Sequence, residues 1–497
     1  MKKPRLSLSA VILMITLSAC INKGTTINVE GLWVSTDETS VLFEPWGQKV
    51  ALLISRDSTK ALNARGFFLK NGEFIADWNF TDVHYDPVAQ KISLTDSDSD
   101  TLICILDNQN EMLKGAIHSV DEKNPLDFIR AGRNLENRIL FPRVPDENEK
   151  IDYSCKRPEQ TGDGLNTESI YNFSVDSSSV SNLMKEIIDQ KYGRIKSLLI
   201  LRNNKLIVEE YFYDYTRDDL QHIRSCTKSV TSLLLGIALD RHQEISIEQA
   251  VFDFFPQYDS LRFEGREEIR LKHILTMTAG LEWDDYPPEM YKTEDCLGYI
   301  LSRPMAAIPG EKFNYNSGCS VLLGGIIENL EGKKPLLFAE EFLFTPLGIT
   351  NYIWESHNSD ILRCGEGLSL RPRDMAKIGL LVLNDGEWQD KQLVSKEWIF
   401  ESTGPQVKES DFFDYGYQWW HHSKNNLQWW KEPNAASPEK HDLIIALGHG
   451  GQYIMIIRDL NLVVVTTASD FESGEMGLSK IPMVIEKIVP IFEETSF

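Results

Sequence analysis

The stretch 223–240, IRSCTKSVTSLLLGIALD, decides how the larger part of this chain is interpreted. Its apolar residues recur at the spacing of one helix face, and they are Val230, Leu233, Leu234, Ile237 and Ala238. The period predicts an amphipathic helix with its apolar face turned inward. Ser225 and Lys228 stand three residues apart where that helix begins.

Ser225 and Lys228 have the spacing of a nucleophile and its base. One helical turn separates them, so the amine lies within reach of the hydroxyl. A serine attacks a carbonyl only if its proton is removed, and backbone amides at a helix N-terminus stabilise the oxyanion that forms. The same four residues also fit a helix-capping serine followed by a solvated lysine, which is the commoner meaning of the pattern taken alone.

Five further blocks favour the chemical interpretation, because they follow the first in a fixed order. They are RLKHILTMTAGLEW (270–283), PGEKFNYNSGCSVLLGGIIE (309–328), GLSLRPRDMAKIGLLVLNDGEW (367–388), YGYQWW (415–420) and LGHGGQYIMIIRDLNLVVVTT (447–467). Together with IRSCTKSV they resemble the serine hydrolases of the class C β-lactamase and penicillin-binding-protein type. The resemblance covers residues 165–490 and is greatest to the 6-aminohexanoate-dimer hydrolase and β-lactamase-like esterase branch.

The resemblance implies a catalytic trio. Ser225 becomes the acylated nucleophile, Lys228 helps to deprotonate it, and Tyr315 shares the role of base and passes a proton to the leaving group. The run His449-Gly450-Gly451 matches the family's Lys-Thr-Gly or His-x-Gly strand. The backbone amides of Ser225 and Gln452 would then form the oxyanion hole.

Two departures from the family pattern affect the substrate. The usual Tyr-x-Asn is replaced by Tyr315-Asn316-Ser317, so the amide is either shifted by one position or replaced by a hydroxyl. His449 stands where many β-lactamases have a lysine, so a fixed positive charge for a β-lactam carboxylate is missing. We expect Asn316, Ser317, Trp419 and Trp420 to line the substrate cleft, although the two tryptophans equally fit core packing.

The composition limits the kinds of binding partner and cofactor that we expect. A formal net charge of −23 repels the phosphates of nucleic acids, so nucleic acid is not expected as a partner. The histidines outside the site show no metal-ligand spacing, and no metal site is predicted. Reaction through an acyl-serine needs no metal or organic cofactor. The oligomeric state and the pairing of the cysteines stay open.

The first residues, MKKPRLSLSAVILMITLSAC, read as a secretory signal: a basic start, an apolar run and small residues before Cys20. The end of this segment resembles a bacterial lipoprotein signal, in which the cysteine is lipidated. We therefore expect a signal peptide at 1–19 and a lipidated tether at 20–27, with lipidation on Cys20. The protein would be anchored by lipid in the bacterial cell envelope and face the periplasm or the cell exterior.

The pattern of apolar and polar residues divides the rest of the chain into three segments. Residues 28–135 carry short β-rich runs with turn signals and predict a small all-β barrel or sandwich, while 136–164 is polar and aperiodic and predicts a linker. Residues 165–497 begin and end with strand-like runs around a helical middle. We expect an α+β fold there: an antiparallel sheet flanked by helices, with an inserted helical region, as in the β-lactamase and transpeptidase fold.

The function predicted from the sequence is cleavage of an ester or amide bond, in a small molecule or a short peptide, through an acyl-serine. One alternative is a D,D-peptidase or β-lactamase that acts on cell-wall peptides or penicillins. Another is a non-catalytic sensor that binds a ligand in the cleft, against which the retention of Ser225, Lys228 and Tyr315 together argues.

Overall fold

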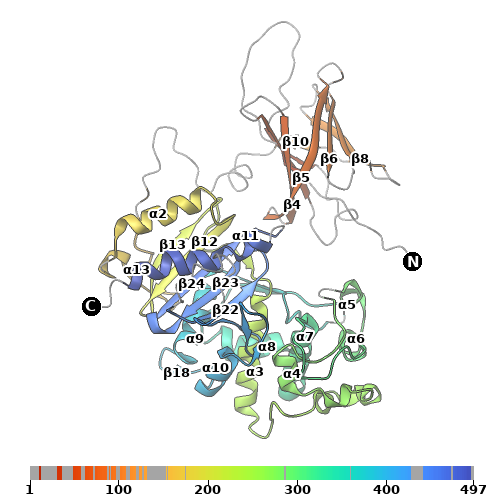
Figure 1. The fold of residues 1–497 in the computed structure, drawn as a ribbon, viewed down its shortest axis with the longest axis vertical. Coiled ribbons are helices and arrows are strands. Elements are labelled where there is room, and N and C mark those ends of the chain that lie inside the picture. The colour runs from red at the N-terminus through yellow and green to blue at the C-terminus, as the bar shows by residue number, and fades with distance from the viewer. Residues whose placement is uncertain are drawn as a thin grey trace. The chain divides into compact units, whose positions relative to one another are not determined.

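A computed structural model shows two compact units (Figure 1). The first comprises Met1–Glu149 with the short segments Phe212–Asp214 and Ser469–Gly474, and the second comprises the remainder of Lys150–Phe497. The structure describes residues 11–12, 31–35, 49–56, 62–70, 73–86, 89, 91–96, 101–107, 112–118, 123–125, 128–130, 153, 155–173, 175–284, 287–358, 360–426, 440–471 and 474–493. The predicted lipidation site, Cys20, lies outside the described residues.

The strands of the first unit form one antiparallel sheet that closes on itself. They are β1 (Val11–Ile12), β2 (Gly31–Ser35), β3 (Lys49–Arg56), β4 (Leu62–Lys70), β5 (Glu73–Asp86), β6 (Lys91–Asp96), β7 (Thr101–Asp107), β8 (Met112–His118), β9 (Lys123–Pro125) and β10 (Phe128–Arg130). From β2 to β8 each strand pairs with the next, and β10 pairs with both β8 and β2. Of the two predicted forms, a barrel or a sandwich, the closed ring of pairings is that of a barrel.

Buried and more exposed residues alternate along the strands, and the buried ones form the interior of the barrel. In β7 the buried residues are Leu102, Cys104 and Leu106, and the residues between them are partly or fully exposed. Because successive side chains of a strand point to opposite faces, one face of β7 is apolar and turned inward. A ring of about eight strands is narrow enough for such side chains to fill.

The second unit is built on a nine-stranded sheet in the order β11-β13-β12-β24-β23-β22-β21-β20-β19. These strands are β11 (Asn166–Thr167), β12 (Ile195–Arg202), β13 (Lys205–Tyr211), β19 (Val407–Lys408), β20 (Asp414–Tyr415), β21 (Trp420–His422), β22 (Leu443–Gly448), β23 (Gln452–Ile457) and β24 (Leu462–Ala468). The early hairpin β12–β13 turns at Asn203 and Asn204, both with positive φ as such tight turns require. β12 pairs with β24. The predicted sheet assembled from both ends of the domain is therefore confirmed.

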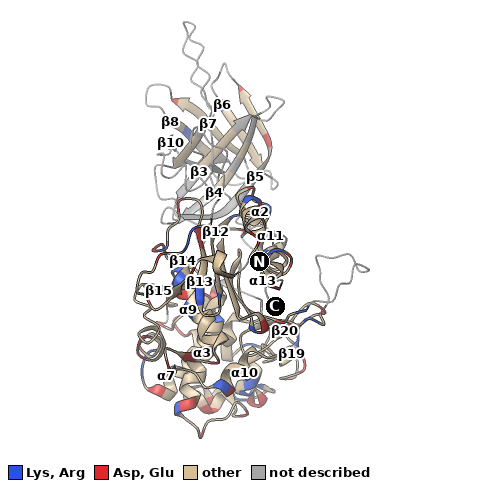
Figure 2. Cartoon of the chain, turned by 90° about the vertical axis from the view of Figure 1, so that its left-hand side faces the viewer, with Lys and Arg blue, Asp and Glu red and all other residues tan. Residues whose placement is uncertain are grey.

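Helices cover both faces of this sheet (Figures 1 and 2). One face carries α2 (Ser177–Ile188) together with the C-terminal helices α11 (Gly474–Leu478), α12 (Lys480–Met483) and α13 (Val489–Glu493); a π-helical turn, Val484–Ile488, joins the last two. The other face carries α3 (Cys226–Arg241), α9 (Pro372–Leu383) and α10 (Lys396–Thr403). The inserted helical region comprises α4 (Leu271–Leu275), α5 (Pro288–Lys292), α6 (Cys296–Leu301), α7 (Ser317–Glu331) and α8 (Pro335–Ala339). Two small sheets complete the unit: β14 (Gln221–His222) with β15 (Tyr352–Trp354) and β16 (Leu368–Leu370), and β17 (Glu387–Trp388) with β18 (Lys391–Gln392).

Helix α3 differs from the expectation of a single apolar face. Every residue from Cys226 to Ala238 is buried, including the polar Thr231 and Ser232. The cause is its central place, since α3 contacts the sheet, α7 and α10. Helix α10 comes so close that a Cβ at Gly236 would overlap the indole of Trp398. A helix surrounded in this way buries its polar face as well. The Thr231 hydroxyl lies within hydrogen-bonding distance of the carbonyl oxygens of Thr227 (3.0 Å) and Cys364 (2.9 Å).

The described part of the predicted linker packs on the second unit. Residues 155–164 form no helix or strand, yet the Arg373 guanidinium donates hydrogen bonds to Thr161 Oγ1 (2.6 Å) and to an Asp163 carboxylate oxygen (3.2 Å). The compact unit that contains this segment begins at Lys150. Among the helices that the structure describes, none combines the length and the apolar character needed to cross a membrane.

Candidate active site

Ser225 occupies the N-cap position of α3 without acting as its cap. Arg224, immediately before it, has a left-handed φ of 53°, and this turn brings the chain into the helix. Ser225 itself has helical angles, and its hydroxyl makes no capping hydrogen bond. Instead Ser225 Oγ accepts a hydrogen bond of 3.1 Å from Lys228 Nζ. The helix-cap interpretation of the pair therefore does not describe this site.

The Lys228 ammonium is the centre of the site. Its side chain is 1% exposed, and Nζ donates to Ser225 Oγ, to Ser317 Oγ (3.0 Å) and to the carbonyl oxygen of Gly365 (2.8 Å). A protonated lysine has three N–H donors, so these three acceptors satisfy all of them. The ring of Tyr315 adds a cation–π contact, with Nζ 4.7 Å from the ring centroid.

Tyr315 lies in the loop that leads into α7. The backbone around it is fixed by Asn314, whose N–H donates to the carbonyl of Met277 (2.8 Å). The half-buried ring stacks on the indole of Trp420, with centroids 5.8 Å apart and an angle of 30° between the planes. It also meets the edge of Tyr415 at 6.4 Å. Aromatic side chains hold the tyrosine from one side while Lys228 lies over its face.

The structure separates the two residues that follow Tyr315. Asn316 is the N-cap of α7, and its side-chain oxygen accepts a hydrogen bond from the N–H of Cys319 (3.2 Å). Ser317, which is fully buried, provides the hydroxyl next to Lys228. At the third position of the tyrosine motif a hydroxyl thus takes the place of the amide, while the neighbouring amide caps a helix.

The His-Gly-Gly run forms the tight turn between β22 and β23. Gly448 and Gln452 are the paired residues at its base, and Gly450 and Gly451 have φ values of 81° and 93°, a conformation that favours glycine. A Cβ at Gly448 would collide with the carbonyl oxygen of Ile223, so this end of the turn lies against the residues just before Ser225.

Cys226 Sγ ties the turn to α3, because it lies within hydrogen-bonding distance of the carbonyl oxygens of Ala446 (3.3 Å) and Gln452 (3.2 Å). The backbones of Gln452 and of the residue after Ser225 are therefore neighbours. The Gln452 side chain points elsewhere, since its amide donates to the Ala468 carbonyl (2.7 Å). His449 is exposed at the tip of the turn.

The two tryptophans expected in the cleft have different environments. Trp419 is fully buried in the core. Trp420 is half-buried and stands in an aromatic group with Phe313 (6.1 Å) and Phe413 (5.5 Å) as well as with Tyr315. Trp420 is therefore the member of the pair that contacts a residue of the predicted catalytic trio, Tyr315.

Two groups that support the site were not predicted from the sequence: the Gly365 carbonyl and Gln418. The Gly365 carbonyl carries no side-chain signal, and it reaches Lys228 across 137 positions of sequence. Gln418 lies within the YGYQWW block, with a left-handed φ of 67° and 1% exposure. Its amide donates to the Leu275 carbonyl (3.0 Å) and its side-chain oxygen accepts from Ser320 Oγ (2.6 Å), which ties α4 to α7 beside the nucleophile helix.

Of the histidines outside the site that could serve as metal ligands, namely His421, His422 and His441, the last two have other partners. His441 contacts the carboxylates of Asp459 (2.5 Å) and Glu493 (2.9 Å), and His422 contacts the carbonyl of Phe412 (2.8 Å). Burial lowers the pKa of His421. Among the described residues there is no group of three or more His, Cys, Asp or Glu side chains arranged to hold a metal ion. The described cysteines form no disulfide with one another.

Known proteins are similar to this chain in sequence. The Beta-lactamase family matches residues 184–483. A 6-aminohexanoate-dimer hydrolase of Paenarthrobacter ureafaciens is 22% identical over 231 residues, which are 41% of this chain and 55% of that protein. The protein flp of Staphylococcus aureus is 24% identical over 177 residues, 33% of this chain and 35% of that one. The chain thus spans about half, or less, of these curated relatives.

Solved structures share the fold. A Bacillus anthracis protein described as a candidate 6-aminohexanoate-dimer hydrolase has a TM-score of 0.52 at 21% identity, covering 63% of this chain and 83% of that one. A candidate β-lactamase of Bacteroides dorei has a TM-score of 0.52 at 19% identity, covering 64% and 99%. These likenesses establish the fold class predicted for the second unit. The family match extends over the helix with Ser225 and Lys228, the tyrosine loop and the glycine turn, and this chain belongs to the Beta-lactamase family of serine-type hydrolases.

Proposed function

We propose that this protein hydrolyses a carboxylic ester or amide through an acyl intermediate on Ser225. The observation that carries the proposal is the position of Lys228 Nζ, 3.1 Å from Ser225 Oγ and bonded to two further acceptors. As a neutral amine, Lys228 has two N–H donors and one lone pair. Ser317 and the Gly365 carbonyl would accept the two donors, which leaves the lone pair facing the Ser225 hydroxyl.

In the proposed acylation, the Ser225 proton moves to Lys228 while Oγ forms a bond to the carbonyl carbon of the substrate. The backbone N–H groups of Ser225 and Gln452 would stabilise the oxyanion. When the intermediate collapses, the bond to the leaving group breaks and the leaving group takes a proton from the Tyr315 hydroxyl, which Lys228 then reprotonates. In deacylation, water attacks the acyl-serine with the same pair as base, and the acid and free Ser225 are released.

An apolar or aromatic ester is the substrate class best supported. Since Tyr315 delivers the proton to the leaving group in this scheme, the group passes the ring stacked on Tyr315, which is that of Trp420. Aromatic rings favour flat apolar groups. The residue at the position of the family's lysine is the exposed His449, so a carboxylate-bearing β-lactam lacks a fixed cation there.

The test is hydrolysis of a chromogenic short-chain ester by the full chain, with Ser225→Ala in parallel. The proposal expects turnover by the wild type and a loss of at least about a thousandfold in the variant. Equal turnover by both proteins would remove Ser225 from the mechanism. A chromogenic β-lactam and a D-Ala-D-Ala peptide serve as second substrates, and preference for either would favour the penicillin or cell-wall alternative. Ligand binding without any turnover would favour the sensor.

We further propose that the protein is anchored by lipid on Cys20 in the bacterial cell envelope. The support is the charge, apolar run and small residues of the leader. Expression of the full chain in a bacterium with labelled palmitate tests this. The wild type should incorporate label and sediment with membranes, whereas Cys20→Ala should do neither. Equal labelling of both proteins would contradict the proposal.

A further inference from the structure

A polar cavity of about 490 Å³ lies in the second unit, outside the predicted catalytic trio and the glycine turn. The residues that line it are Glu159, Thr161, Asp163, Arg217, Asp218, Arg371 and Arg373. Its described lining therefore holds three guanidinium groups and three carboxylates. No step of the proposed hydrolysis uses any of them.

Arg373 is the fixed member of this group, since its side chain is buried. Its guanidinium donates to both carboxylate oxygens of Glu209 (2.7 Å each), to Thr161 Oγ1 (2.6 Å), to Asp163 Oδ2 (3.2 Å) and to the Glu159 carbonyl (2.7 Å). These contacts use all five N–H donors of an arginine. Arg373 thus shapes the wall of the cavity and has no donor left for a ligand.

Arg371 is held along one edge only. Its Nε and Nη2 donate to the fully buried Asp374 carboxylate at 2.7 and 3.3 Å, and Lys377 Nζ donates to the same carboxylate (2.9 Å). Nη1 makes no hydrogen bond to a described residue, and its ionic neighbour is Asp218 Oδ1 at 4.0 Å. That distance is too long for a hydrogen bond. The guanidinium is therefore already oriented and keeps donors for a ligand.

Arg217 and Asp218 are adjacent in the chain and lie near the surface. Arg217 is 33% exposed and donates through Nη2 to Glu159, the one hydrogen bond that its guanidinium makes to the residues that the structure describes. Asp218 is 77% exposed, and an ion pair at 4.0 Å between groups of this kind contributes little to stability. Both side chains can therefore turn toward a ligand at small cost.

The signs of these charges decide the class of ligand. A simple anion would gain contacts to Arg217 and Arg371, but the three carboxylates of the lining would repel it. A simple cation would meet the reverse conflict. A molecule that carries a carboxylate and an ammonium a few ångströms apart satisfies both sets, because each of its charges meets the opposite sign.

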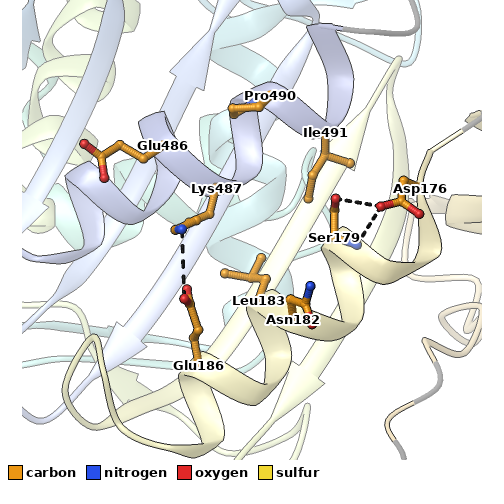
Figure 3. Close-up of a pocket in the computed structure, with 9 residues that line it drawn as sticks. All are labelled: Asp176, Ser179, Asn182, Leu183, Glu186, Glu486, Lys487, Pro490 and Ile491. Atoms are coloured by element: carbon orange, nitrogen blue, oxygen red, sulfur yellow. Dashed lines mark hydrogen bonds and ion pairs between the residues drawn. The ribbon is translucent and has the colours of Figure 1, made fainter.

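A smaller cavity of the same unit, of about 240 Å³, provides a contrast. It lies between α2 and the C-terminal helices, and Figure 3 shows its lining. Its described charged residues are Asp176, Glu186, Glu486 and Lys487, and Lys487 Nζ lies 3.9 Å from Glu186. This lining is acidic, so it lacks the balance of charges that the larger cavity has.

We propose that the larger cavity binds a small zwitterion of the amino-acid class, with its carboxylate on the guanidinium groups of Arg217 and Arg371 and its ammonium on Asp218. A guanidinium and a carboxylate form parallel N–H···O bonds, which fix the direction of the ligand as well as its charge. The site does not involve Ser225, so the inference holds or fails independently of the proposed hydrolysis.

The experiment measures binding to the full chain by isothermal titration calorimetry at low ionic strength. The probes are β-alanine, which carries both charges, propionate and propylamine, which are of similar length and carry one charge each, and inorganic phosphate. We expect β-alanine to bind with a Kd on the order of 1 mM, and each singly charged analogue to bind at least about fivefold more weakly because it lacks one charged contact. Added salt should weaken the binding of β-alanine.

Two variants separate the two ends of the ligand. Arg217→Gln should weaken β-alanine and propionate about fivefold and leave propylamine unaffected, whereas Asp218→Asn should weaken β-alanine and propylamine and should not weaken propionate. Matched controls come from another surface pair of the same unit, in which Arg262 is 35% exposed and Asp259 is 70% exposed and lies 3.9 Å from it. Arg262→Gln and Asp259→Asn should bind all probes as the wild type does.

Three results would overturn the inference. It fails if β-alanine does not bind, or if propionate or phosphate binds as tightly as β-alanine, since the cavity would then select an anion. It also fails if folded Arg217→Gln and Asp218→Asn bind β-alanine as their controls do, because the ligand would then lie elsewhere on the protein. The Tm of each variant shows whether it is folded, and Arg217→Met or Asp218→Ser is measured in place of one that is not.

Discussion

Lys228 Nζ lies 3.0 Å from the hydroxyl of Ser317, nearly the same distance as from the hydroxyl of Ser225 at 3.1 Å. By binding Lys228 Nζ, Ser317 therefore helps to orient the amine toward the hydroxyl of Ser225. We expect Ser317→Ala to lower kcat by about tenfold, because a hydrogen bond to a charged group is lost in a buried site. Steady-state kinetics with a chromogenic ester measures this, and an unchanged kcat would contradict it.

Asn316→Ala provides the contrast with its neighbour. The Asn316 side chain caps α7, so its loss should lower the free energy of unfolding by about 1 kcal/mol. Thermal or urea unfolding gives the value. If Asn316→Ala affects kcat more than Ser317→Ala does, the assignment of the two residues would have to be exchanged.

Lys228→Arg should fail to replace the lysine. Arginine keeps the charge, but it does not give up a proton at any accessible pH and its planar fork does not fit three acceptors placed around one atom. We expect both Lys228→Arg and Lys228→Met to reduce kcat by about a thousandfold or more. Labelling with a fluorophosphonate reports the reactivity of Ser225 independently of substrate. Rapid labelling of either variant would argue against Lys228 as base.

Trp420→Ala should raise KM for aromatic esters more than for acetyl esters of small alcohols. The indole stacks on Tyr315, and an aromatic contact of this kind contributes about 1 kcal/mol, or roughly fivefold in affinity. Trp420→Phe, which keeps a ring, is the matched variant and should retain most of the preference. Equal changes for both classes of ester would indicate that Trp420 only supports Tyr315.

Because His357 is buried, we expect the protein to be less stable to unfolding in mild acid. The histidine is 4% exposed, and burial, assisted by the nearby Arg363, lowers its pKa to about 4. In the unfolded chain a histidine titrates near pH 6.5, so between about pH 6.5 and 4 the unfolded state binds a proton that the folded state does not. His357 should therefore lower the free energy of unfolding by about 3 kcal/mol as the pH drops through this window, and its own contribution should level off below it.

The pH dependence has a direct control. His357→Leu should flatten the unfolding curve between pH 6.5 and 4, while His273 and His421, whose pKa values are also lowered by burial, keep a smaller slope in the same direction. Urea unfolding across the pH range measures the difference between the proteins. Identical slopes for wild type and His357→Leu would exclude His357 as the source.

Local patterns in the sequence determined the elements of the fold. Period and turn residues predicted the helix that begins after Ser225, the strands at both ends of the second unit and the β-rich first unit. These features depend on neighbours within a few positions, so they can be read from one chain. The prediction that Ser225 is the nucleophile and Lys228 its base came from the same local spacing together with five ordered blocks, and it stays a prediction. The signal peptide, the lipidated Cys20 and the domain limits stay predictions.

Only the tertiary structure decided how polar groups meet inside the protein. The burial of α3 on all sides depends on its position between the sheet and two helices, which its own period does not specify. Ser317 rather than Asn316 contacts Lys228, the Gly365 carbonyl completes that contact from 137 positions away, and Lys480 reaches Gly451 from α12. Such contacts join segments far apart in the chain, and the free energy that selects them comes from burial and hydrogen bonding in three dimensions rather than from local sequence.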